Sequence, residues 1–328
     1  MYHIAFICDD AYAMPTMVAI HSIIDSVQQI EITVHVCSFA LSVENIRCFK
    51  SLSKGNIFVT VEIFSKEMLA DKLAKVSQRT HVTTTALLKL ELPNFFPQID
   101  KLLYLDSDVV VKGDLSYLLS LELNDNMYLA ATFDYWIHFN AIRYKWKRNI
   151  RDDFYFNSGV MYLNLRMMRM HNIVEKLWDY KLTKAKTTLM DQECFNEVCK
   201  NHVFPISVKW NFNPVFFSKE NLRDINRVYN ENYDNLEKLL ADVRIIHYVG
   251  KTDKPWVYST ARLNDYWLKE FEKTNLNYQL NLIDYQYQRK NPFIASIEKI
   301  KEHGFLGYIS FVRYTLEKKY TNKIKEIK

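Results

Sequence analysis

Glycine, proline and cysteine are all scarce in this chain: its 328 residues include 6 Gly, 7 Pro and 5 Cys. No GxGxxG loop follows a strand, which disfavours a dinucleotide-binding dehydrogenase fold, because that fold needs glycines where the backbone approaches the pyrophosphate. The five cysteines are scattered, mostly in apolar segments, and form no CxxC pair. This spacing argues against a zinc site and favours free thiols in a reducing compartment.

Long apolar runs and a strong net charge are missing as well. No stretch of eighteen apolar residues predicts a membrane-spanning helix, and the first residues lack the basic and apolar regions of a signal peptide. We therefore expect a cytoplasmic protein. The formal net charge of +5 is too small to indicate nucleic-acid binding. Apolar residues make up 48% of the chain and charged residues 25%, which are ordinary values for a globular enzyme.

The segment 101–112, KLLYLDSDVVVK, contains two carboxylates, Asp106 and Asp108, between two apolar runs. Apolar runs of this length are typical of buried strands, and a buried strand rarely ends in unpaired carboxylates. Two carboxylates aimed at one point form a site for a hard divalent cation. An acidic turn is the alternative, but apolar strand on both sides makes a poor simple turn. The motif predicts a metal site and chemistry on a phosphate-bearing substrate.

Strands and helices alternate through the first half of the chain. The expected elements are strands at 3–8, 32–37 and 58–64, helices beginning at Pro15, Ser42 and Ser65, and a helix near 84–92 that stops at Pro93. This alternation indicates an α/β fold with a mostly parallel sheet. Ligands of such sheets bind at the carboxyl ends of the strands. Because Asp9, Asp10, Asp106 and Asp108 all follow strands, we expect one cleft to hold all four.

The second half is less regular and ends in a segment of different composition. The expected elements are strands at 127–132, 160–163 and 243–247 and helices at 166–184 and 191–200. From about residue 276, and most clearly from Asn291, lysines and aromatic residues accompany a helical apolar face. We expect a catalytic domain over residues 1–275 and a basic aromatic helical tail over 276–328. The tail fits either an interfacial helix on an anionic membrane or a solvated helix packed on the domain or a frayed end.

Five motifs resemble, in order, those of glycosyltransferase family 8. This family contains retaining transferases of the GT-A fold that use nucleotide sugars, among them bacterial lipopolysaccharide galactosyl- and glucosyltransferases and glycogenin. The motifs are AFICDDAY at 5–12, YLDSDVVV at 104–111, FNSGVMYLN at 156–164, MDQE at 190–193 and HYVGKTDKPW at 247–256. Several ordered motifs are more specific than one short pattern, and these cover roughly the first four-fifths of the chain.

The resemblance implies a role for each motif. Asp106, Asp108 and His247 would ligate Mn²⁺, with Mg²⁺ as the alternative. The donor, a UDP-hexose, would be bound by Ile7, Asp9, Tyr12, Asp108, Asp134, Asn157, Gly250 and Lys254. Within this set, Asp9 would bind the uracil, and Gly250 and Lys254 would hold the diphosphate. Asp191 and Gln192 would flank the anomeric carbon, although Asp191 also fits a helix N-cap.

The chain departs from the family pattern at three positions. Ala11 stands where the family commonly has Asn, so a nucleotide contact is missing. Leu87 stands where the family often has Arg, and Lys89 is a candidate replacement. The segment HYVGKTDKPW is one residue longer than the commonest version, HxxGxxKPW. Lys251 and Lys254 therefore both remain candidates for the diphosphate contact.

The implied reaction explains why these residue types are needed. Cleavage of the bond between the anomeric carbon and the diphosphate builds negative charge on the leaving group, which a divalent cation and a lysine offset. Retention requires either a double displacement, with a nucleophile opposite the leaving group, or attack from the same face. Because Gln192 is a poor nucleophile and the resemblance makes Asp191 a sugar-hydroxyl binder, we expect same-face attack.

We therefore expect a retaining transferase that moves galactose or glucose from a UDP-sugar to a glycan or glycolipid acceptor. Lipopolysaccharide or capsule, built at the inner face of the membrane, is the expected acceptor. One alternative is a haloacid-dehalogenase-type phosphatase, because the segment LDSDVVV is similar to the DxDx(T/V) motif that carries the nucleophile of those enzymes. That motif normally lies near the start of its domain, whereas a set of strands and helices precedes it here. The other alternative is a nucleotide-sugar-binding protein without turnover.

Overall fold

The computed structural model describes residues 1–27, 29–76, 84–135, 137, 155–183, 190–250, 253–274, 276 and 278–283. The chain divides into two compact units, Met1–Phe133 with Phe156–Tyr285 and Asp134–Tyr155 with Gln286–Lys328. The first unit contains a seven-stranded sheet and the helices around it. The described residues of the second unit are Asp134, Tyr135, Ile137 and Tyr155.

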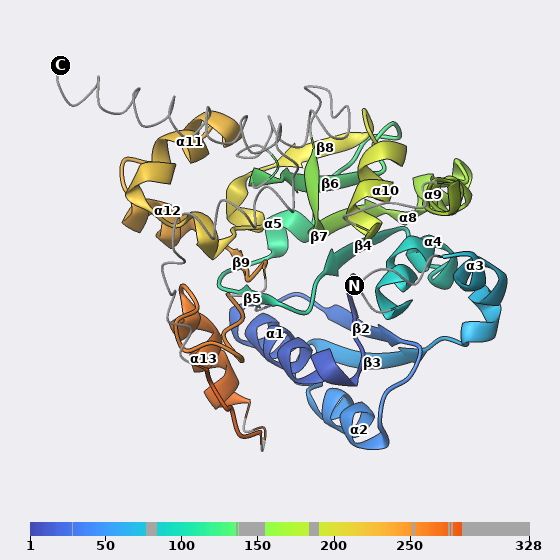
Figure 1. Cartoon of the computed structure of the whole chain (residues 1–328), viewed down its shortest axis with the longest axis horizontal. Coiled ribbons are helices and arrows are strands. Elements are labelled where there is room, and N and C mark those ends of the chain that lie inside the picture. Colours follow the sequence, from blue (N-terminus) through green and yellow to red (C-terminus); the bar gives the residue numbers. More distant parts are fainter. Residues whose placement is uncertain are drawn as a thin grey trace, which may run out of the picture. The chain divides into compact units, whose positions relative to one another are not determined.

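A seven-stranded sheet with the order β3-β2-β1-β4-β7-β6-β8 forms the centre of the first unit (Figure 1). Its strands are β1 (Tyr2–Ile7), β2 (Ile32–Ser38), β3 (Ile57–Ile63), β4 (Lys101–Leu105), β6 (Leu129–Phe133), β7 (Phe156–Asn164) and β8 (Val203–Ile206). The pairs β1–β2, β1–β4, β2–β3 and β6–β8 are parallel, whereas β7 runs antiparallel to both β4 and β6. The prediction of an α/β fold with a mostly parallel sheet is confirmed.

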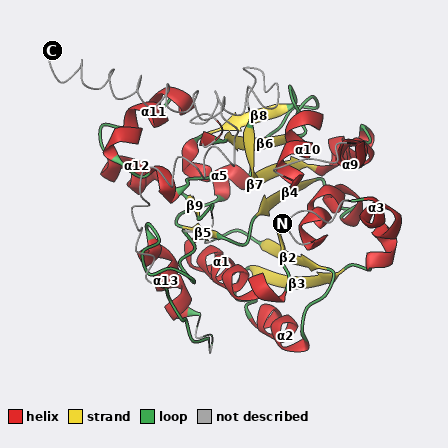
Figure 2. Cartoon of the chain, in the orientation of Figure 1, coloured by secondary structure: helices red, strands yellow, loops and turns green. Residues whose placement is uncertain are grey.

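Helices surround this sheet (Figure 2). They are α1 (Ala13–Ser26), α2 (Val43–Ser51), α3 (Ala70–Lys75), α4 (Leu92–Phe95), α5 (Ser116–Leu119), α8 (Leu165–Met170), α9 (Ile173–Thr183), α10 (Met190–Val198), α11 (Lys219–Tyr229), α12 (Leu236–Asp242) and α13 (Asn264–Lys273). The central strands are apolar on both faces because both are covered: Phe6 and Leu103 on one face and Ala5 and Leu102 on the other are fully buried. The predicted N-cap Ser42 accepts a hydrogen bond from the backbone N–H of Asn45 at the start of α2.

Two predicted helices differ from the structure. The helix expected to stop at Pro93 is a 3₁₀ helix, η3 (Thr84–Glu91), and the short α4 then passes through Pro93. Pro93 lies in the first turn of α4, where a missing N–H breaks no intrahelical bond. The single helix expected over 166–184 is two helices, α8 and α9, interrupted at Asn172, whose φ of 52° is left-handed. Asparagine tolerates this conformation better than most residues.

A second, two-stranded sheet positions the acidic motif. Strand β5 (Val109–Val111) leaves the line of β4 and pairs antiparallel with β9 (Ile245–His247), with Val109 opposite His247. The backbone of the intervening motif is fixed at both ends. Asp106 N–H donates to Gly159 O at 2.8 Å, and Tyr248 N–H donates to Asp108 O at 2.9 Å. The motif is therefore held between β7 of the large sheet and β9 of the small one.

The structure describes few residues of the predicted C-terminal tail. Residues 284–328, and with them nearly all of the predicted tail over 276–328, lie outside the described residues. The boundary at residue 275 and the attachment of the tail to a membrane therefore stay predictions. Among the described residues, no helix combines the length and the apolar character that crossing a membrane requires.

Candidate active site

A cleft of about 280 Å³ opens beyond the carboxyl ends of β1 and β4. Its lining includes six residues that the sequence predicts for the site: Ile7, Asp9, Tyr12, Asp106, Asp108 and Asp191. Lys89 and Tyr104 also line it, and both are buried. This is the edge at which parallel sheets bind their ligands.

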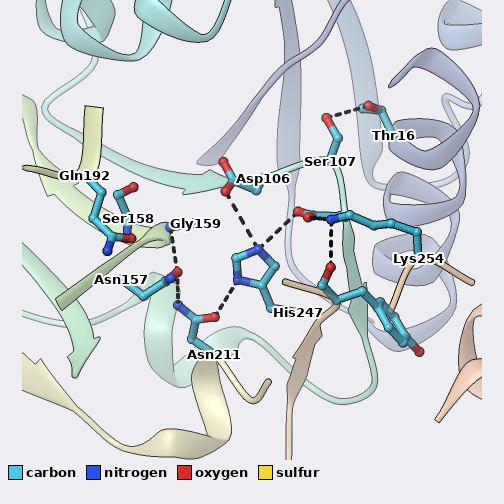
Figure 3. A network of polar contacts seen from close by, with 12 residues as sticks. Thr16, Asp106, Ser107, Asn157, Ser158, Gly159, Gln192, Asn211, His247 and Lys254 are labelled. Carbon is cyan, nitrogen blue, oxygen red and sulfur yellow. Dashed lines mark hydrogen bonds and ion pairs between the residues drawn. The ribbon is translucent and has the colours of Figure 1, made fainter. Parts of the chain in front are cut away.

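Asp106, Asp108 and His247 converge on one point beside this cleft. Figure 3 shows Asp106 facing the imidazole of His247. One possible ligand atom from each lies within 4.8 Å of the others. His247 Nε2 is 3.1 Å from Asp108 Oδ1 and 3.8 Å from Asp106 Oδ2. Two carboxylates and an imidazole suit a divalent cation such as Mn²⁺, which accepts both kinds of ligand. The three residues fit a divalent metal site.

Lys254 maintains the ionised state of Asp108. Its ammonium group pairs with Asp108 Oδ2 and donates to Tyr248 O at 2.7 Å. Burial raises the pKa of Asp108, but the charge of Lys254 and then that of His247 outweigh burial and hold this pKa well below its usual range. Asp108 is thus a carboxylate able to bind a cation. A bound cation would compete with Lys254 for it and free the ammonium group for another anion.

Gly159 leaves the space that the imidazole of His247 occupies. It lies in β7, beside the ring (Figure 3). A Cβ at this position would lie 2.1 Å from His247 Cε1 and 2.7 Å from Asp106 Oδ2. Real side chains do not approach so closely, so glycine is required here by the metal ligands rather than by backbone conformation.

Lys89 links Asp106, a candidate metal ligand, to helix α10, which carries the residues predicted to be catalytic. Its Nζ lies 3.1 Å from Asp106 Oδ1 and 2.7 Å from Asp191 Oδ2, and 4.4 Å from the ring centre of Tyr104. Burial lowers the pKa of Lys89, but the charges of Asp106 and Asp191 outweigh burial and raise it above its usual value. The positively charged ammonium group of Lys89 therefore lies between the carboxylates of Asp106 and Asp191. Leu87, at the position of the family's arginine, is buried in the core.

Replacing Lys89 with methionine is expected to destabilise the protein by at least about 2 kcal/mol, because the partly buried Asp106 and Asp191 lose their shared counter-charge. Urea unfolding measures this change. The matched control is Lys101→Met, which breaks a surface pair with Glu122, since such pairs contribute at most about 1 kcal/mol. Equal destabilisation by the two substitutions would contradict the assigned role of Lys89.

Asp191 and Gln192 are both held by Ser158. Ser158 Oγ donates to Asp191 Oδ2 at 3.0 Å, and Ser158 N–H donates to Gln192 Oε1 at 3.1 Å. Both acceptors belong to the first turn of α10, which begins at Met190. Asp191 is therefore inside the helix, and its alternative role as an N-cap is wrong. Asp191 lines the cleft, whereas Gln192 is held against the backbone of β7.

One of the four carboxylates expected in the cleft is directed elsewhere. Asp10 Oδ1 accepts hydrogen bonds from Ser42 N–H at 2.9 Å and Asn45 Nδ2 at 2.7 Å, so Asp10 ties the β1 loop to the start of α2. These hydrogen bonds lower the pKa of Asp10. The neighbouring Asp9 does line the cleft, and its side chain accepts from Tyr12 N–H at 3.3 Å.

The remaining residues that the sequence predicts to bind the sugar donor lie at different places in the fold. Asn157 lies beside the metal ligands, with its Oδ1 accepting from Gly159 N–H at 3.0 Å. Gly250 has a φ of 104°, which favours glycine at the turn after β9. Asp134 belongs to the second unit, where its side chain accepts from Ile137 N–H at 3.0 Å, and its role as a donor contact stays a prediction. Lys251 lies outside the described residues.

Sequence reasoning did not assign a role to Asn211, Gly159 or Ser158. Asn211 is 7% exposed, and its Oδ1 lies 2.8 Å from His247 Nδ1. A signal existed, because Asn211 is a polar residue between two buried aromatic residues, Trp210 and Phe212. Buried polar side chains need partners, so such an isolated asparagine marks a hydrogen-bonded role. The identity of its partner depends on contacts distant in sequence.

The model of the glycosyl transferase family 8 matches residues 3–260 of the chain. The chain belongs to glycosyltransferase family 8. Among curated family relatives, a lipopolysaccharide 1,2-glucosyltransferase of Escherichia coli is 28% identical over 265 residues, which span 78% of this chain and 73% of that protein. A lipopolysaccharide 1,3-galactosyltransferase of Salmonella typhimurium is 22% identical over 266 residues, with the same two coverages.

A solved structure of the galactosyltransferase LgtC in complex with donor and acceptor sugar analogues is similar to this family 8 chain. The TM-score is 0.68 at 26% identity, and the match covers 84% of this chain and 98% of LgtC. The prediction of a GT-A fold and of a glycosyltransferase is confirmed. The phosphatase alternative is wrong, because the family match runs through the acidic motif and the segment around His247.

Proposed function

We propose that the protein transfers galactose or glucose from a UDP-sugar to a glycan acceptor, with retention of configuration and with Mn²⁺ bound by Asp106, Asp108 and His247. The observation that carries this proposal is the convergence of these three side chains at the cleft. The family relatives support it, since those that match over most of the chain include a glucosyl- and a galactosyltransferase.

Each group would have a separate task in this reaction. The bound cation would supply Lewis-acid stabilisation of the leaving diphosphate. Lys254, close to Asp108, would add positive charge at the same place. The ion pair of Asp191 with Lys89 and its hydrogen bond from Ser158 make Asp191 a weak nucleophile. This environment favours same-face attack, in which the leaving phosphate oxygen takes the proton of the acceptor hydroxyl.

The proposed acceptor is lipopolysaccharide, capsule or a similar glycolipid at the inner face of the cytoplasmic membrane. The support is the acceptor class in the names of the Escherichia coli and Salmonella typhimurium relatives. The lysine- and aromatic-rich sequence after Asn291 would hold the protein at an anionic surface. Cosedimentation with liposomes of anionic and of neutral lipid tests this attachment, and equal binding to both would contradict it.

The proposed function is tested by hydrolysis of donors. Purified protein is incubated with Mn²⁺ and, separately, UDP-galactose, UDP-glucose, their N-acetyl forms and GDP-mannose, and released nucleotide is measured with and without EDTA. We expect release from UDP-galactose or UDP-glucose that EDTA abolishes. No release from any donor would favour a binding protein without turnover.

Asp191→Asn and Gln192→Ala are each expected to lower turnover by about 10²-fold while changing donor affinity less than threefold or so, because both would act on charge at the anomeric carbon. Turnover is followed by nucleotide release and affinity by calorimetry with the intact donor. Cys194→Ser, in the same helix and buried, is the control. Near-normal turnover in both variants would remove the assignment of these two residues.

A further inference from the structure

Three hydrogen bonds connect the backbone of β7 to the imidazole of His247 (Figure 3). Gly159 N–H donates to Asn157 Oδ1 at 3.0 Å. Asn211 Nδ2 lies 3.0 Å from the same oxygen, and Asn211 Oδ1 lies 2.8 Å from His247 Nδ1. The result is a chain of contacts from Gly159 through Asn157 and Asn211 to the ring.

The donor and the acceptor of each of these hydrogen bonds follow from the first one, in which Gly159 N–H donates to Asn157. A backbone N–H can only donate, so the atom of Asn157 that faces Gly159 is an acceptor. The group of Asn211 that faces this oxygen must donate, so it is the amide nitrogen. The oxygen of Asn211 then faces His247, and it can only accept. Nδ1 of His247 therefore carries a proton, so the ring can bind a cation only through Nε2.

The other side of the ring faces the carboxylates. Nε2 is the nitrogen that lies 3.1 Å from Asp108 Oδ1 and 3.8 Å from Asp106 Oδ2. A metal-binding histidine needs an unprotonated nitrogen toward the cation and a hydrogen-bond acceptor at its other nitrogen. Asn211 Oδ1 supplies the acceptor at Nδ1. Nε2 can donate to Asp108 while no cation is bound, and a bound cation would replace that proton.

We propose that Asn211 is a positioning residue that fixes the orientation and the Nδ1–H tautomer of His247, and so prepares Nε2 to bind the divalent cation. The inference rests on the metal site of the proposed function. In this role Asn211, and neither Asp106 nor Asp108, determines which of the two ring nitrogens of His247 is left to bind the cation.

The position of Asn211 is itself fixed by the strand that carries His247. Phe212 N–H donates to Ile245 O at 3.0 Å, and His247 N–H donates to Phe212 O at 2.8 Å. The residue after Asn211 is thus hydrogen-bonded to both ends of β9. Asn211 is 7% exposed and His247 is 3% exposed, so bulk water has little access to replace the amide. A rigid, dry acceptor of this kind selects one tautomer effectively.

The test uses two substitutions at Asn211 and one control. Asn211→Leu keeps the branched shape of the side chain but has no polar atom, and Asn211→Asp keeps an oxygen that accepts from Nδ1. The control is Asn164→Leu, which removes a different buried asparagine, one at the end of β7 that accepts from Met167 N–H to cap α8. Two quantities are measured: the Kd for Mn²⁺ alone, without donor, and the His247 tautomer.

The Kd comes from the electron paramagnetic resonance signal of free Mn²⁺. The tautomer is read from the ¹⁵N chemical shift of Nδ1 in labelled, metal-free protein, which reports whether this nitrogen carries the proton that Asn211 would accept. We expect Asn211→Leu to weaken Mn²⁺ binding by about 10- to 100-fold and to lose the Nδ1–H tautomer. Asn211→Asp should bind Mn²⁺ within about threefold of the wild type, and Asn164→Leu should match the wild type in both measurements.

Two results would overturn the inference: an Nε2–H tautomer in the wild type, or Mn²⁺ binding that Asn211→Leu leaves unchanged. A loss of affinity in Asn164→Leu as large as that in Asn211→Leu would also overturn it, because the effect would then be one of general stability. A wild-type protein that binds no Mn²⁺ would instead contradict the proposed function, while the tautomer measurement would still decide the role of Asn211.

Discussion

Replacing Asp108 with asparagine is expected to lower the turnover of the metal-loaded protein by about 10³-fold. Asp108 contacts His247 Nε2 at 3.1 Å and pairs with Lys254. The substitution keeps the shape of the side chain but removes the charge that would bind the cation. The charge that develops on the leaving diphosphate would then lose its main counter-charge. Donor hydrolysis and the Kd for Mn²⁺ should change together.

The matched control is Asp114→Asn, which removes the same charge a short distance along the chain. Asp114 lies outside the cleft and accepts from Ser116 N–H at 3.2 Å at the start of α5. Its loss is expected to leave both Mn²⁺ affinity and turnover close to those of the wild type. If Asp108→Asn were as active as this control, the acidic motif would have no role in metal binding.

Gly159→Ala is expected to lower Mn²⁺ affinity by about 10- to 100-fold and turnover by more than about 10²-fold. A methyl group at Gly159 would occupy the space of the His247 ring, with Cβ 2.1 Å from Cε1. The ring is enclosed and 3% exposed, so it must move out of line with the two carboxylates. The same two assays, hydrolysis and Mn²⁺ binding, detect this displacement.

Gly113→Ala is the corresponding control. There the new Cβ would also approach a side chain closely, with Arg244 Cδ at 2.7 Å, but Arg244 is flexible and about a third exposed. It can move into solvent without disturbing the cleft. A Gly159→Ala protein with the affinity and turnover of the Gly113→Ala protein would show that β7 does not constrain the metal ligands.

The parallel half of the fold was predictable because its signals are local. Strand β1 contains the apolar run 4–7, β2 has apolar residues at alternate positions, and the cap Ser42 marks the start of α2. The acidic residues Asp106 and Asp108 were recognisable for the same reason, since carboxylates at the end of an apolar run conflict with burial unless they have a partner.

The remaining features depend on contacts between distant segments. The antiparallel direction of β7 and the pairing of β5 with β9 leave no trace in the apolar pattern of each strand. Asp10 and Asp9 are adjacent and equally charged, yet only the tertiary position of α2 decides that Asp10 bonds to Asn45. The demand for glycine at Gly159 comes from His247, a residue far away in sequence.

The pairing of β5 with β9 has a consequence for the order of events during synthesis. The contact between Asp108 and Lys254 closes a span of 146 residues. Contacts of such high sequence separation form after local ones, because loop closure must precede any gain from the contact. A nascent chain on the ribosome can thus complete the pairing of β1, β2 and β3 while its acidic motif still has no imidazole. The candidate metal site is complete only after residue 247 has left the exit tunnel.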